Sequence, residues 1–136
     1  MKRTRWIATA LFIAAAATAA VAGDDPSIKG ETRTSVQKAM NQHIEHNTIK
    51  DKYVIYDAVE GELKKLKFDA LHKGIVRKGD FYVSCADFVD AQGKKYDIDF
   101  LVAEKKDSFN VLQALVHSIE GKKRPYHLEE EKAAKK

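Results

Sequence analysis

No proline interrupts the chain between Pro26 and Pro125, and this feature constrains the fold more than any other. Proline removes a backbone donor and is excluded from the middle of a sheet, so its absence leaves room for long strands. From Tyr53 onward, apolar and polar residues alternate with a period of two, which is typical of strands that bury one face. We therefore predict about five sequential strands joined by short turns.

Five stretches carry this strand pattern. Asp90-Ala91-Gln92-Gly93-Lys94 is predicted to be a hairpin turn in which glycine supplies the left-handed residue. Residues 74–80 contain two glycines and are predicted to form a loop. The predicted strands are 53–56, 66–70, 81–89, 96–103 and 109–119. The predicted core is the even-numbered side of the central hairpin, with Tyr82, Ala86, Phe88, Ile98, Phe100 and Val102.

A helix is predicted before the strands. Thr34-Ser35-Val36-Gln37 fits a capping box, with a hydroxyl at the N-cap and a glutamine three residues later. Apolar residues then recur at spacings of three and four, which predicts a helix over residues 35–47. The fold class is therefore α+β: one N-terminal helix packed on a four- to five-stranded antiparallel meander sheet.

The first 22 residues have the organisation of a secretory signal. A positive start is followed by an uncharged apolar run from Trp6 that ends in Ala20-Val21-Ala22. We predict cleavage after Ala22, a periplasmic or secreted location, and no stable membrane anchoring afterwards. A membrane anchor is the alternative, although the run is shorter than a typical span. Beyond it we predict a flexible lead (23–33), a single domain (34–128) and a charged tail (129–136).

The net charge and the cysteine count exclude some classes of function and structure. The chain has a net charge of +4. Three of its 24 basic residues and none of its 20 acidic residues lie in residues 1–22, so the remainder carries +1. That balance gives no electrostatic case for binding nucleic acid. We expect the partner to be a protein or a small molecule, and the single cysteine excludes an internal disulfide.

The turn after the first predicted strand reads Asp57-Ala58-Val59-Glu60-Gly61. The order of a helix, a strand, a tight turn and three more strands over residues 34–120 resembles the cystatin-like fold. Cystatins that inhibit cysteine proteases carry Gln-x-Val-x-Gly in this hairpin, where Val59 and Gly61 match and Asp57 does not. They also use a Pro-Trp pair in a later loop. The one tryptophan here is Trp6, which lies in the predicted signal, so the predicted mature chain has no tryptophan. The resemblance implies an inhibitor-like module; the other interpretation is that Gly61 simply forms a turn.

A second resemblance concerns the central hairpin. The chain is similar to small secreted bacterial proteins of unassigned function in which a Cys-x-Asp-Phe strand pairs with a Tyr-Asp-x-Asp-Phe strand. These motifs are found here at residues 85–88 and 96–100. The resemblance implies a compartment and a fold, and no activity.

The odd-numbered side of this hairpin is chemically unusual. If Asp90 pairs with Lys94, then Asp87 faces Asp97 and Cys85 faces Asp99, on the side away from the core. Opposed carboxylates destabilise each other, so water, a lysine, a histidine or a metal ion should compensate. Other donors on the same side would be His117, given an even register in the last strand, and the more distant His72.

This side of the hairpin has three interpretations. It is a solvated sheet face, a face for another ligand or partner, or a divalent-metal site built from Cys85, Asp87, Asp97, Asp99 and His117. Thiol catalysis by Cys85 with His117 is disfavoured, because the cysteine lies in mid-strand among acids. We predict no catalytic residue and no cofactor, with a divalent metal as the alternative. The protein is predicted to be a non-catalytic binding or interaction module.

Overall fold

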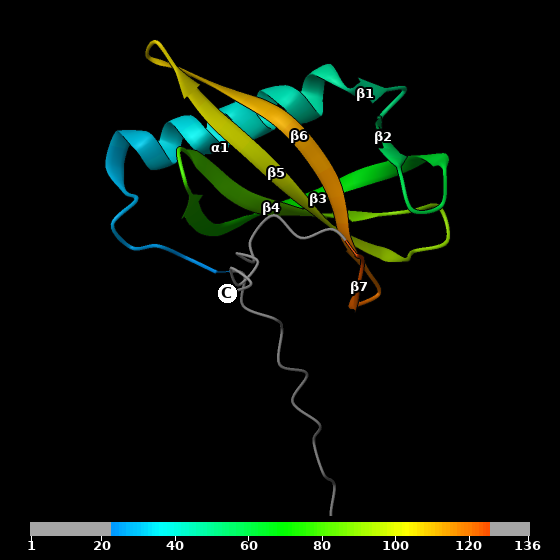
Figure 1. Cartoon of the computed structure of the whole chain (residues 1–136). Coiled ribbons are helices and arrows are strands. Elements are labelled where there is room, and N and C mark those ends of the chain that lie inside the picture. The colour runs from blue at the N-terminus through cyan, green and yellow to red at the C-terminus, as the bar shows by residue number, and fades with distance from the viewer. Residues whose placement is uncertain (1–22, 126–136) are drawn as a thin grey trace, which may run out of the picture.

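The computed structural model describes residues 23–125, and these form one helix and one antiparallel sheet (Figure 1). Each strand pairs with the next along the chain. The elements are α1 (Gly30–His46), β1 (Thr48–Ile49), β2 (Lys52–Asp57), β3 (Glu62–Lys78), β4 (Phe81–Val89), β5 (Lys95–Lys105), β6 (Ser108–Ile119) and β7 (Lys122–Lys123). The α+β class and the antiparallel meander are thus confirmed.

The predicted number of four to five strands is wrong, because the described residues form seven. The two additional strands, β1 and β7, contain two residues each, which is too short for any periodicity to show in the sequence. The predicted signal segment 1–22 and the charged tail 129–136 lie outside the described residues.

The helix begins earlier than the capping-box pattern predicts. Its N-cap is Lys29, which makes no side-chain cap hydrogen bond, and Thr34 lies inside the helix with its hydroxyl donating to the Gly30 carbonyl at 3.1 Å. The start is stabilised instead by Arg33, whose guanidinium donates to the Asp24 carboxylate at 2.7 Å and to the Lys73 carbonyl. A tertiary contact therefore replaces the local cap.

Residues 23–29, predicted to be part of a flexible lead, are held against β3. The Asp25 backbone N–H donates to the Ile75 carbonyl at 2.8 Å, and the Ile75 N–H donates to the Asp24 carboxylate at 3.1 Å. Ile28 is buried. The lead is therefore an ordered edge of the domain, because its two aspartates bind β3 and Arg33.

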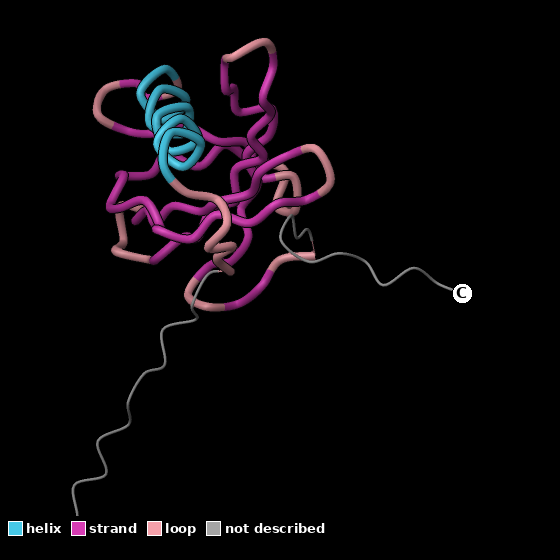
Figure 2. Tube along the Cα trace, turned by 90° about the vertical axis from the view of Figure 1, so that its left-hand side faces the viewer, coloured by secondary structure: helices cyan, strands magenta, loops and turns pink. Residues whose placement is uncertain are grey.

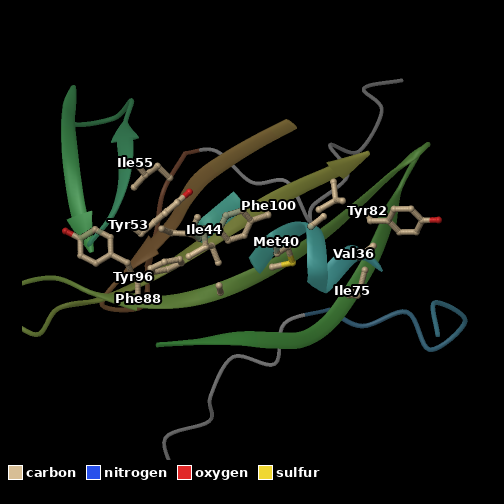
Figure 3. Close-up of a cluster of buried hydrophobic side chains, with 14 of the residues drawn as sticks. Val36, Met40, Ile44, Tyr53, Ile55, Ile75, Tyr82, Phe88, Tyr96 and Phe100 are labelled. Carbon is tan, nitrogen blue, oxygen red and sulfur yellow. The ribbon is translucent and has the colours of Figure 1, made fainter. Parts of the chain in front are cut away.

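The core lies between α1 and the even-numbered side of β4 and β5 (Figure 3). Figure 2, turned by 90°, shows the helix along one side of the strands. The Tyr53 and Phe88 rings stack with centroids 4.9 Å apart, and Phe100 lies beside both. Helix α1 contributes Val36, Ala39, Met40 and Ile44. All six core residues predicted on the hairpin are buried, so this prediction is confirmed.

Strand β3 continues to Lys78, through most of the loop predicted at residues 74–80, and the turn is confined to residues 79–80. Its pairing with β4 shifts register twice, between Phe68 and Ala70 and again between Leu71 and Ile75. The second shift forms a bulge, residues 72–74, in which the Gly74 carbonyl accepts a hydrogen bond from the Ser84 hydroxyl at 2.7 Å. Glycine in a strand often marks such a bulge, which bends the strand and redirects its side chains.

Candidate metal centre

The β4–β5 hairpin has the predicted register. Asp87 pairs with Asp97, and Cys85 pairs with Asp99. The odd-numbered side is not a solvated surface at its centre, because Cys85, Asp99 and Val83 are each 0% exposed. The Cys85 thiol and the Asp99 carboxylate therefore meet in a buried environment on the side of the sheet opposite the helix, with Asp97 partly exposed and Asp87 half exposed beside them.

A bulge in β6 brings His117 to this side. The register between β5 and β6 shifts between Asp97 and Ile98, so that Ser118 pairs with Asp97 and Val116 pairs with Ile98. His117 lies between them, with Nδ1 3.0 Å from Asp99 Oδ1 and 3.9 Å from Asp97 Oδ2. The structure therefore places His117 on the predicted face.

His72 lies much closer to the centre than the sequence indicates. The bulge in β3 directs its side chain to Asp87, with Nε2 2.8 Å from Asp87 Oδ1. Asp87 was predicted as a metal ligand, but it is not among the clustered donor atoms described below. It contacts the His72 ring instead and orients it. The one sequence signal for this position was Gly74, two residues later in the same strand.

Two groups of potential metal ligands share Asp97. One contains His72, Cys85 and Asp97, and the other contains Asp97, Asp99 and His117. Within each group one donor atom per residue lies within 4.8 Å of the others. A tetrahedral zinc ion with bonds of 2.0–2.3 Å separates its ligands by about 3.3–3.8 Å. The donor atoms of each group are thus no more than about 1.5 Å beyond this separation, and His117 Nδ1 and Asp99 Oδ1 are 3.0 Å apart.

Three atoms in this cluster are buried without a hydrogen-bond partner in the described part of the chain. They are His72 Nδ1, Asp97 Oδ1 and Asp99 Oδ2. The Asp99 side chain is 1% exposed, and its other oxygen accepts from the Cys85 thiol at 3.2 Å. Buried polar atoms almost always have a partner, since leaving one unpaired costs about 1–3 kcal/mol. Three such atoms in one cluster indicate a site prepared for an additional group.

The electrostatics of the cluster favour a cation. Burial raises the pKa of Asp97 to about 6, and the negative charges of Asp99 and Asp87 add to this effect. His72 and His117 lower the pKa of Asp97 but do not cancel the increase. A bound cation would stabilise the ionised carboxylate and remove this unfavourable contribution.

The inhibitor-like turn is explained by its own hydrogen bonds. Asp57 is buried, and its carboxylate accepts from the Val59 N–H at 3.0 Å and pairs with the Arg124 guanidinium. Gly61 has φ +70°, a conformation that glycine adopts without strain. Sequence reasoning missed Arg124, which lies far away in the chain. Val59 is exposed, but the residues beside it have a structural role.

No protein-family model, curated protein or solved structure matches this chain. The resemblance to cystatins therefore depends on topology alone. Among residues 23–125, no helix is both long enough and apolar enough to cross a bilayer.

Proposed function

We propose that this protein is a secreted or periplasmic, non-catalytic binding module whose ligand is a divalent transition-metal ion. The location is supported by the signal-like pattern of residues 1–22. The observation that carries the metal proposal is the set of three unpartnered buried atoms, contributed by His72, Asp97 and Asp99. They come from β3 and β5, and Cys85 on β4 and His117 on β6 are grouped with them.

The contact between Asp87 and His72 supports this proposal independently. When the neutral imidazole donates its Nε2 hydrogen to the Asp87 carboxylate, Nδ1 retains a free electron pair. Histidines that bind metals are commonly held in this way by a carboxylate behind the ring. The unpartnered Nδ1 of His72 is the nitrogen that this arrangement prepares for a metal.

The mixture of donors indicates which ion fits. Imidazole nitrogen, thiolate sulfur and carboxylate oxygen together suit Zn²⁺ and its transition-metal neighbours. Ca²⁺ and Mg²⁺ prefer shells made of oxygen alone. Cys85 must lose its proton to bind, so loading should release protons into the solution.

We also propose that the scaffold is cystatin-like. A helix packed across sequential antiparallel strands supports this topology. The buried ion pair of Asp57 does not favour the inhibitor alternative, and an assay for papain inhibition tests it.

The metal proposal is tested with the chain from Gly23 to Lys136, which contains every described element and lacks the apolar leader. After treatment with a chelator, Zn²⁺ binding is measured by calorimetry and Co²⁺ binding by absorption, where a sulfur-to-cobalt band reports Cys85. We expect one ion per chain with submicromolar affinity. Asp97→Asn/Asp99→Asn should abolish binding.

The matched control is Asp51→Asn/Asp107→Asn, which removes the same charge from two exposed turn residues. Both have positive φ, at 65° and 62°, which asparagine tolerates. This control should bind metal like the parent chain. No binding at micromolar metal, or equal binding by both double variants, would refute the proposal.

A further inference from the structure

The outer face of the β1–β2–β3 ribbon is exposed and partly apolar. In this ribbon Ile49 pairs with Lys52, and Val54 pairs with Lys65. These residues lie on the side opposite the buried Tyr53. Figure 1 shows β1 and β2 at one end of the molecule, beyond the last turn of α1. The ribbon therefore presents a second face that the core does not use.

Large apolar side chains are strongly exposed on this face. Ile49 is 63% exposed, Leu63 is 62% exposed and Tyr56 is 60% exposed. A groove of about 390 Å³ lies between Ile49 and Leu63. It is lined by Ile49, Lys50, Lys52, Val54, Leu63 and Lys65. Clustered exposed apolar residues mark surfaces that contact a partner or a membrane.

All the charged residues that line this groove are positive. Three of its six lining residues are lysines and none is acidic. Lys64, next to Lys65 on β3 but on the inner face, differs because it forms ion pairs with Glu60 and Glu62. No described acidic residue forms an ion pair with the three groove lysines. The complementary surface must therefore be both negatively charged and apolar.

We propose that this ribbon face binds the surface of an anionic lipid bilayer. Lysines would contact the lipid phosphates while Ile49 and Leu63 enter the boundary between headgroups and acyl chains. Tyr56, beside Leu63, has the amphipathic ring that is enriched at this depth. A second copy of the chain is a poorer occupant, because two lysine-lined grooves repel each other. The proposed lipid-binding face shares no residue with the metal centre, so the lipid proposal and the metal proposal can be refuted separately.

The test uses sedimentation of the chain from Gly23 with vesicles of phosphatidylcholine, with or without an equal part of phosphatidylglycerol. Binding is expected only to the anionic vesicles, and it should weaken between about 50 mM and about 500 mM salt. Lys52→Gln/Lys65→Gln should reduce binding about 25-fold, since each lysine near an anionic surface strengthens binding about fivefold. Ile49→Thr/Leu63→Thr should also reduce binding, while both variants keep the parent melting temperature.

The charge-matched control is Lys38→Gln/Lys105→Gln, which alters exposed lysines on α1 and β5 and should bind like the parent chain. Three outcomes would overturn the proposal: no sedimentation at millimolar lipid, equal binding to neutral vesicles, or an equal loss in the control. A lipid-free dimer that Ile49→Thr/Leu63→Thr dissociates would also overturn it, because the occupant would then be a second copy.

Discussion

The two faces of the β4–β5 hairpin bury opposite kinds of side chain, apolar on one face and ionisable on the other. The even-numbered face carries side chains such as Phe88 and Phe100, which pack beneath α1. The odd-numbered face is also buried at its centre, but there it contains Cys85 and Asp99 with Asp97 beside them, and one carboxylate oxygen of each aspartate is buried without a partner. Apolar burial stabilises a fold, whereas burial of unpaired charge destabilises it. The difference indicates that the even face maintains the structure, and the odd face is where we propose that the metal binds.

The largest effect is expected on the even face. Phe100 is fully buried, and its ring lies 5.7 Å from His43 and 6.5 Å from Phe88, measured between centroids. Phe100→Ala should lower the free energy of unfolding by about 3–5 kcal/mol, because it leaves a cavity beneath the helix. Urea denaturation followed by circular dichroism measures this loss. A decrease below about 1 kcal/mol would show that the even face is not the stabilising one.

A second effect should be confined to the odd face. Asp87→Ala removes the carboxylate behind His72 without touching a proposed ligand, and we expect Zn²⁺ affinity to fall about 10- to 100-fold. Stability without metal should hardly change, because the Asp87 side chain is 48% exposed. Glu104→Ala, at an exposed position of the same sheet, is the charge-matched control. Equal affinities for both variants in calorimetry would remove Asp87 from the site.

The third prediction separates stability from function at a single residue. Burial raises the pKa of Asp97 to about 6, so its ionised form is unfavourable at neutral pH in the metal-free protein. Asp97→Asn should therefore raise the free energy of unfolding at pH 7.5 by about 1–2 kcal/mol, since one pKa unit corresponds to 1.36 kcal/mol. The same variant should lose metal affinity. A lower melting temperature in the presence of a chelator would contradict this assignment.

Much of the fold followed from local patterns. The absence of proline and the period of two predicted β4, β5 and β6, and the five-residue turn after Val89 predicted the hairpin register. Strands β1 and β7 were missed because two residues carry no periodicity. The helix start at Gly30 was missed because it depends on the contact between Arg33 and Asp24, which no local motif encodes.

The candidate site also contains residues that local patterns predicted and one that they did not. Register alone brought Cys85 opposite Asp99 and Asp87 opposite Asp97, since a hairpin turn determines every pair that follows it. His72 was placed too far away, because its position depends on a bulge that adds residues to β3. Bulges change which side chains meet without changing the apolar pattern, so residues brought in by them are the least predictable.

The smallest effect concerns pH, and the two faces should respond with opposite sign. His43 lies on α1 with its ring against Phe100 of the even face, and burial there lowers its pKa below the usual range, with a further contribution from His46. The unfolded chain then binds a proton near pH 6.5 that the folded chain excludes, so His43 costs stability as the pH falls from about 6.5 through its lower folded pKa. Asp97 acts in the opposite direction, because its folded pKa of about 6 exceeds the unfolded value of 3.8. Protonation of Asp97 therefore stabilises the fold as the pH falls through this interval.

The contribution of His43 is isolated in the Asp97→Asn background, without metal, where the opposing titration is absent. Stability should decline between about pH 7 and pH 5 by no more than about 1 kcal/mol, and His43→Gln should flatten this decline. The exposed His46→Gln is the control and should leave most of the slope. A slope that His43→Gln does not change would assign the titration to another group. Loss of the decline in both variants would indicate that the charges of the two histidines act as a coupled pair.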